Sequence, residues 1–274
     1  MVIIYHKQTG VALWQTRADT LKGADLSHAN LFAADLKGMN LADANLCGAN
    51  LCTADLEDAI LTGADLTGSD FSCGNLLRCD LSRATLIDAK GLGCNLWSAN
   101  LQGARLRHID LQFAVLREAN LQDAQLQRAS LSDTQMMDAR FCGADLTGAA
   151  LTRAILDGAN LRYATLTYTT LHAASLRNAN LANTDLSYAT LCEAALIGAD
   201  LTEAMLLKAI FSRCADLHLT VGLDSILHAG PSALDQATLR SCVAQLPQGF
   251  LAGVGYTPAE VAALCALYPA ASAL

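Results

Sequence analysis

Between residues 21 and 211, one apolar residue returns at every fifth position. Leu fills 34 of these 39 positions, and the exceptions are Phe71, Gly91, Met136, Phe141 and Phe211. Two residues before these positions the side chain is small except at Met39 and Ile109, with Ala at 29 of 38 sites, and one residue before them it is Asp or Asn at 20 of 38. The repeating unit is therefore Ala-(Asp/Asn)-Leu followed by two variable residues.

A period of five residues fits neither a regular helix nor a flat strand. On a helix, successive leucines would turn by about 140° and scatter around the axis. On a flat strand, an odd period would send alternate leucines to opposite faces. The leucines share one direction only if the chain bends at every pentad and winds around an axis. The pattern predicts an all-β solenoid in which each Leu, and each Ala two residues earlier, faces inward.

The units Ala24-Asp25-Leu26, Ala29-Asn30-Leu31 and Ala44-Asn45-Leu46 resemble those of the pentapeptide-repeat family. This resemblance covers roughly residues 20 to 215. It implies a right-handed quadrilateral β-helix with one pentad on each side and 20 residues in each coil. The number of sides comes from the resemblance, since the period by itself also allows three or five. Just under ten coils are expected, forming a rod of ~47 Å at the usual ~4.8 Å spacing between strands.

Both ends of the predicted rod look like caps, which an open apolar coil requires. We expect a β-hairpin cap over residues 1–17, the repeats over 18–215 and an α-helical cap over 216–274. In the last segment, helices are predicted from 231 to 246 and, after the capping box from Thr257 to Glu260, from 261 to 267. Residues 228–255 also resemble a segment that links such repeats to TIR-type domains in some bacterial proteins, so the tail is either only a cap or a docking element.

Composition narrows the choice of function class. Charged residues make up only 16% of the chain, and the net charge of −8 with a pI near 5.1 excludes a basic nucleic-acid-binding protein. No apolar run approaches the ~18 residues that a membrane span needs, and the N-terminus lacks the pattern of a signal peptide. We therefore expect a soluble, cytoplasmic protein that does not contact membranes.

Residues that carry catalytic or metal chemistry are scattered. The six histidines form no ligand pair at helical spacing, and the ten cysteines form no Cys-x-x-Cys motif. We expect reduced, structural cysteines, with Cys79, Cys94 and Cys214 facing inward. The segment 91–93, Gly-Leu-Gly, is interpreted as a local bulge rather than as a phosphate-binding loop. The sequence therefore predicts a protein that is not an enzyme and holds no metal or cofactor.

With 20 residues in each coil, outward residues 20 apart would stack in columns. One column contains Leu77, Trp97, Arg117 and Met137, an apolar strip that predicts contact with a protein partner or with a second copy of the chain. The alternative is internal packing against the expected bulge at position 91 or against the tail. Tyr168 and Tyr188 form a second candidate, either as a contact surface or as a ring ladder that stabilises the rod.

The leading hypothesis for function is a non-catalytic protein-interaction scaffold or recognition module. The family resemblance also implies an alternative, a DNA mimic that binds a type II topoisomerase such as gyrase and inhibits or protects it. Duplex DNA as long as the rod carries roughly 28 negative charges, far more than the repeats present, but the coils that contain Asp35, Asp55 and Asp65 approach the local density of DNA. A purely structural rod is the third possibility.

Overall fold

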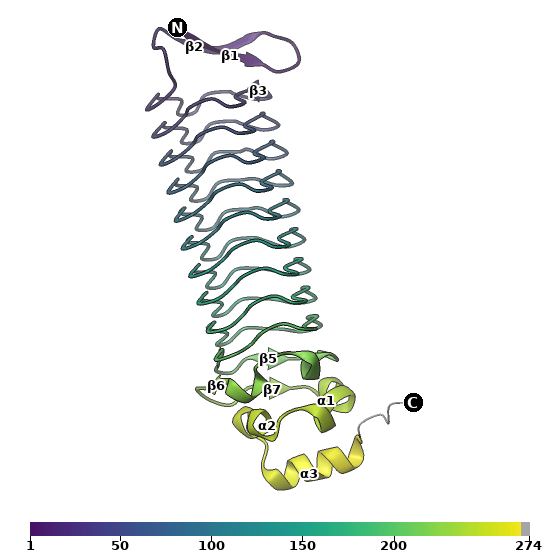
Figure 1. Cartoon of the computed structure of the whole chain (residues 1–274). Coiled ribbons are helices and arrows are strands. Elements are labelled where there is room, and N and C mark those ends of the chain that lie inside the picture. Colours follow the sequence, from purple (N-terminus) through teal and green to yellow (C-terminus); the bar gives the residue numbers. More distant parts are fainter. Residues whose placement is uncertain (270–274) are drawn as a thin grey trace.

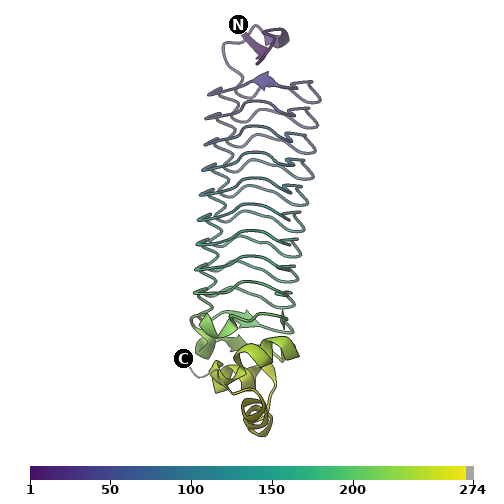
Figure 2. The same cartoon turned by 90° about the vertical axis from the view of Figure 1, so that its right-hand side faces the viewer.

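The computed structural model describes residues 1–269 and consists of stacked coils that form an elongated rod (Figures 1 and 2). The N-terminal hairpin lies at one end and the C-terminal helices lie at the other. Parallel bridges join outward residues to those 20 positions later, for example Asp25 to Asn45 and Asn100 to Asn120. Each coil therefore consists of four pentads.

Each pentad contains one turn and one bridge. In the first of them, the backbone N–H of Ala24 donates to the carbonyl of Leu21 at 3.0 Å, and the N–H of Leu26 donates to Asn45 of the next coil at 2.7 Å. The third residue of this turn, Gly23, has a φ of 65°, as type II turns require at that position. The Asp25 carboxylate accepts from the Ser27 N–H at 3.1 Å and braces the following turn. The five-residue period is the length of this unit.

The predicted inward positions form the core, with the repeated leucines at most 3% exposed and the alanines beside them mostly buried. The prediction of a local bulge at position 91 is wrong. Gly91 donates to the Asp110 carbonyl at 2.7 Å and Gly93 to that of Gln112 at 2.9 Å, so this coil keeps the regular pattern. The core tolerates a glycine here because the ring of Phe71, one coil earlier, fills the space.

The N-terminal hairpin joins the first coil through backbone pairing. Strands β1 (Val2–His6) and β2 (Ala12–Thr16) are antiparallel, with an irregularity in register between Ile4 and Tyr5. Strand β1 also pairs with β3 (Ala34–Asp35). Ile4 is fully buried, which places the inner face of the hairpin against the core.

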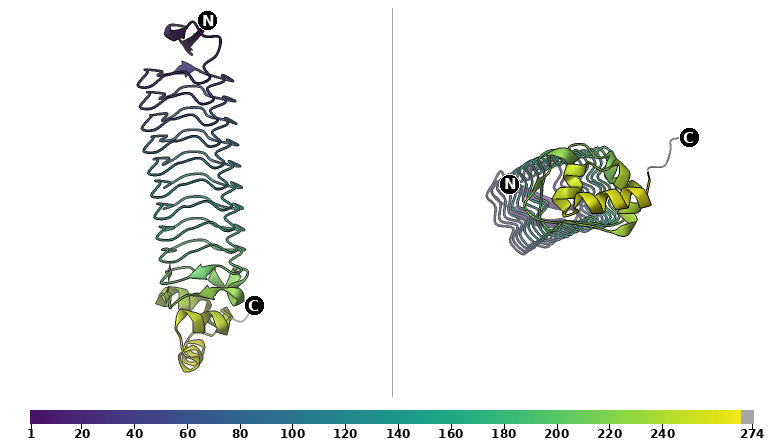
Figure 3. Two further views of the ribbon diagram at one scale, coloured as in Figure 1. Left: turned by 90° about the vertical axis from the view of Figure 1, so that its left-hand side faces the viewer. Right: turned by 90° about the horizontal axis from the view of Figure 1, so that it is seen from below.

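The last coils continue into a helical segment that covers the C-terminal end of the rod (Figure 3). Strand β4 (Met205–Leu206) pairs in parallel with β6 (Leu227–His228), and β5 (Ile210–Phe211) pairs in parallel with β7 (Ala233–Leu234). The stacking therefore extends past the last repeat. The elements in order are β4 Met205–Leu206, β5 Ile210–Phe211, η1 Leu217–Leu219, η2 Leu223–Ser225, β6 Leu227–His228, β7 Ala233–Leu234, α1 Gln236–Cys242, η3 Val243–Gln245, α2 Gln248–Val254 and α3 Pro258–Leu267.

Helix α3 agrees with the prediction, and its capping box between Thr257 and Glu260 is complete. The helix predicted from residue 231 begins instead at Gln236, because β7 first pairs with the coil and Asp235 then acts as the N-cap. The Asp235 carboxylate accepts from the Thr238 N–H at 2.8 Å and from the Arg213 N–H at 3.0 Å. One side chain thus starts α1 and ties it to the last coil. Helix α2 was not predicted.

Candidate functional site

The structure stacks the predicted strip as one column. Bridges from Asn75 to Asn95 and from Asn95 to Val115 hold the coils of Leu77, Trp97 and Arg117 in register. Trp97 is 41% exposed, whereas Leu77, Arg117 and Met137 are half-buried, so the strip has one prominent side chain rather than a continuous exposed ridge. Nor do the described residues of the tail cover Trp97, since the helical cap lies at the C-terminal end of the rod.

Arg117 packs on the indole of Trp97. Its guanidinium carbon lies 5.4 Å from the ring centroid, within the range of a cation–π contact. The Arg117 Nε atom is shielded from solvent and has no hydrogen-bond partner among the described residues. The contact therefore holds the indole in place while its edge stays open to solvent.

Two further exposed apolar side chains, which the column pattern did not reveal, border the same side of the rod. Leu92 is 42% exposed and lies on the coil of Trp97, at the preceding corner, and Phe113 is 57% exposed at that corner one coil later. Together with Trp97 they define what we call the apolar side. Phe113 has a φ of 61° at the turn position where the previous coil has Gly93, and the same conformation recurs at this position in most pentads, so it is a regular part of the repeat.

A shallow hollow of about 300 Å³ adjoins Trp97. It is lined by Leu77 and Trp97 together with Arg78, Ser98 and Glu118, and the Ser98 hydroxyl donates to Glu118 at 3.2 Å. An apolar floor with a charged rim suits the side chain of a partner protein better than a reacting small molecule.

The rings of Tyr168 and Tyr188 stack on each other in successive coils. Their rings are parallel, with an interplanar angle of 5° and centroids 4.6 Å apart. The Lys208 ammonium lies 5.8 Å from the centroid of the Tyr188 ring and extends the column by one coil. Tyr168 remains 61% exposed, so this geometry is compatible with both a stabilising ladder and a contact surface.

The acidic N-terminal residues do not form one surface. Asp35 and Asp55 are bridged in one column, whereas Asp65 lies in a different column beside Asn45 and Thr85. The Asp55 carboxylate accepts from the side-chain amide of Asn75 at 3.0 Å, and that of Asp65 accepts from the Thr67 N–H at 2.9 Å. Sequence spacing by itself would have separated these columns once the coil length was fixed.

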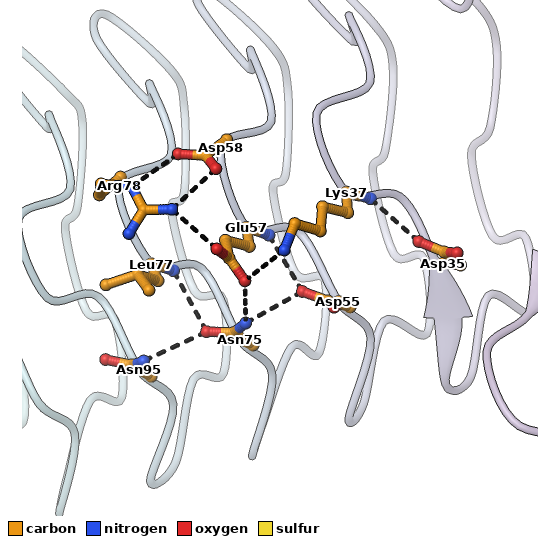
Figure 4. A network of polar contacts seen from close by, with 9 residues as sticks. All are labelled: Asp35, Lys37, Asp55, Glu57, Asp58, Asn75, Leu77, Arg78 and Asn95. Atoms are coloured by element: carbon orange, nitrogen blue, oxygen red, sulfur yellow. Dashed lines mark hydrogen bonds and ion pairs between the residues drawn. The ribbon is translucent and has the colours of Figure 1, made fainter.

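Two carboxylates in these coils, those of Glu57 and Asp58, are neutralised by an ion-pair network (Figure 4). Glu57 accepts from Lys37 at 3.0 Å and from Arg78 at 2.7 Å, and Arg78 also bonds Asp58 at 2.8 Å. The hydrogen bond from Lys37, followed by that from Arg78, lowers the pKa of the Glu57 carboxyl. The network therefore stays ionised at neutral pH and reduces the field that these coils present.

Cys79, Cys94 and Cys214 are buried, as expected, and burial raises the pKa of each thiol. Among residues 1–269 there is no cluster of His, Cys, Asp or Glu suited to hold a metal ion. Within the same residues, no single helix has the length and apolarity to cross a bilayer. Only α2 and α3 taken together pass that test, and they are bent by 115° at the break between them.

Comparison with known proteins gives a clear result for the repeats. A family model described as pentapeptide repeats matches the chain in eight copies, and the matched residues are 20–46, 34–72, 53–88, 94–133, 134–172 and 174–213. These matches end before the C-terminal helices. None of the curated proteins matches the chain.

Several solved structures are similar. HetL, a pentapeptide repeat protein involved in heterocyst differentiation regulation from the cyanobacterium Nostoc sp. strain PCC 7120, is 28% identical over 80% of this chain and 93% of its own, with a TM-score of 0.44. QnrB1, a plasmid-mediated fluoroquinolone resistance protein, is 18% identical over 77% and 87%, with a TM-score of 0.35. A pentapeptide repeat protein from the Arabidopsis thaliana thylakoid lumen is 25% identical over 43% and 69%, with a TM-score of 0.26.

Proposed function

Since the chain belongs to the pentapeptide-repeat family, we propose that it is a non-catalytic protein-interaction module that binds a protein partner through its apolar side. The observation that carries this proposal is the exposure of Leu92, Trp97 and Phe113 on one side of the rod, within two successive coils. Exposed aromatic side chains anchored on a rigid scaffold are typical of the central residues of an interface.

The rest of the rod suits a scaffold. We propose a right-handed quadrilateral β-helix over residues 18–215, with the hairpin of residues 1–17 and the helices after 215 as its caps. The backbone bonds between coils hold each outward side chain at a fixed height, so the anchors lose little conformational entropy on binding. The cytoplasm is the compartment that fits ten free cysteines.

The alternative, a DNA mimic that binds a type II topoisomerase, has weaker support. A mimic needs acidic side chains in rows that imitate two phosphate strands, and here Asp65 lies in a different column from Asp35 and Asp55. Lys37 and Arg78 also neutralise two of the neighbouring carboxylates. A gyrase supercoiling assay, with and without a quinolone, tests this alternative directly.

The decisive experiment for the module compares two exposed aromatic residues. Trp97→Asp removes an anchor of the apolar side, while Tyr163→Asp is the matched control, because Tyr163 is 56% exposed in a different column. Wild type and both variants are used as baits in lysate of the source organism, and self-association is measured by sedimentation equilibrium. We expect a partner, or a second copy, that is retained by wild type and Tyr163→Asp and lost with Trp97→Asp.

The outcomes of these experiments distinguish the interaction module from the DNA mimic. Equal binding by both variants, with unchanged melting temperatures, would contradict an interface on the apolar side. Inhibition or protection of gyrase that disappears when Asp35, Asp55 and Asp65 are replaced by Lys would instead favour the mimic. An unfolded Trp97→Asp variant would show that the indole is structural.

A further inference from the structure

Four exposed arginines on one side of the rod are not paired with any described residue. The side chains of Arg83, Arg105, Arg107 and Arg128 make no hydrogen bond or ion pair with any other residue of the described chain. Arg105 lies within one column of bridges, between Thr85 and Gln125. The other three arginines lie on either side of that column. We call this group the arginine face.

Other arginines of the rod show how the fold normally pairs such a side chain. Arg153 lies one coil after Asp133 and bonds it at 2.6 Å. Arg213 likewise bonds Glu193, which is 20 residues earlier, at 2.7 Å. The arginine face lacks such stacking. Position 63, one coil before Arg83, is Gly, and the equivalent positions for the other three arginines are Thr85, Ile87 and His108.

The arginine face is compact. Its residues occupy three successive coils, a height of about 10 Å at the usual strand spacing, and lie at two neighbouring corners and on the side between them. The Arg83 side chain leans toward the next coil, since a Cβ at Gly103 would lie 3.9 Å from its Cγ. Like charges this close repel one another in the free protein, and an anionic ligand would relieve that repulsion.

The surroundings limit the size of that ligand. A polar hollow of about 370 Å³ adjoins Arg83, lined by the side chains of Ser82, Asn100 and Gln102 but also by Asp123. His108 is bonded to Asp88 at 3.1 Å. Along the same columns, Asp43 and Asp65 lie toward the N-terminal end and Asp145 toward the C-terminal end. A long polyanion such as duplex DNA would have to pass these carboxylates, whereas a short segment would not.

We propose that the arginine face binds a short acidic segment of a partner protein, four to six residues in extended conformation. Alternate side chains of such a segment lie about 7 Å apart on one face, so two acidic residues two positions apart can reach Arg105 and Arg107, which are also two positions apart. Arginine suits this role because its guanidinium binds carboxylates in a bidentate manner. This surface is separate from the apolar side and does not depend on it.

The test uses fluorescein-labelled hexaglutamate and the full chain, with binding measured by fluorescence anisotropy at about 20 mM salt, where screening is weak. The double variant Arg105→Gln with Arg107→Gln is compared with Arg140→Gln plus Arg177→Gln. The control pair removes the same charge from exposed positions in other columns. We expect the first variant to weaken binding about tenfold and the control less than about twofold.

Several results would overturn the proposal. Equal weakening by the two double variants would mean that only net charge matters, and no binding of hexaglutamate by wild type would mean that the face takes no acidic peptide. Tighter binding of a short DNA duplex with the same number of charges, lost with the same variant, would assign the face to nucleic acid. Melting temperatures control for folding.

Discussion

The ring of Phe71 occupies the space that a side chain at position 91 would need. A Cβ placed on Gly91 would lie 2.2 Å from the Phe71 Cε2 atom and 2.8 Å from the Leu111 Cδ2 atom. Phe71 is fully buried, and it is one of five exceptions to Leu in the core column, as is Gly91. The two departures from the consensus, one coil apart, compensate for each other.

This relationship predicts that restoring the consensus at one position alone is harmful. Gly91→Leu should destabilise the rod by about 1–3 kcal/mol through overpacking, and the double variant with Phe71→Leu should recover most of that loss. Chemical denaturation of the two single variants and the double variant measures the coupling. Additive effects would show that the two sites are independent.

Leu126 tests the register of the whole core. Its side chain is fully buried, so Leu126→Lys places a charge in an apolar interior and should cost about 3–5 kcal/mol. Gln125→Lys, one residue earlier and facing outward, is the matched control and should change stability by less than about 0.5 kcal/mol. Chemical denaturation of the two variants gives their midpoints. Similar midpoints would mean that the assignment of Leu126 to the inward face is wrong.

The tyrosine pair offers a choice between a ladder and a contact surface. Parallel rings at 4.6 Å should give a coupling of about 0.5–1 kcal/mol in a double-mutant cycle of Tyr168→Ala and Tyr188→Ala. The free energies of unfolding of wild type, the two single variants and the double variant, measured under one set of conditions, give this coupling. A coupling near zero would leave a binding role as the reason for the two rings.

His228 makes the C-terminal cap sensitive to acid. Both ring nitrogens are shielded from solvent and have no hydrogen-bond partner among residues 1–269, and a Cβ at Gly253 would lie 2.1 Å from the ring. Burial lowers the pKa of His228 below its usual 6.5. The unfolded chain therefore binds a proton more readily than the folded cap, and stability present above about pH 6.5 is lost as the pH falls.

The neighbours of His228 do not offset this effect, since β4 and α2 contain no charged residue and Asp224 of η2 is exposed. We expect the melting temperature of wild type to fall between pH 7.5 and pH 5 by more than that of His228→Gln, whose side chain does not titrate. Hydrogen exchange in α2 should increase over the same range in wild type. Identical pH profiles for the two proteins would exclude His228 as the cause.

Several features of the fold were predicted from the sequence because they depend on local chemistry. The inward leucines and alanines follow from the pentad period, and the start of α3 follows from the capping box of Thr257 and Glu260. The start of α1 was not predictable in this way. Strand β7 extends the chain up to Asp235 only because Ala233 and Leu234 pair with Ile210 and Phe211, a contact distant in sequence.

For the candidate sites too, some features were predicted from the sequence and others depend on contacts between distant residues. Once the coil length is fixed, a column such as Leu77, Trp97 and Arg117 can be read from residues 20 apart. The sequence by itself thus determined the repeat, its inward face and the vertical neighbours, since one five-residue unit recurs throughout the rod. Only the tertiary structure showed that Leu92 and Phe113 are exposed, that the side chains of the arginine face have no bonding partner among the described residues, and that the Phe71 ring fills the space at Gly91. Exposure, pairing and packing depend on neighbouring coils and corners.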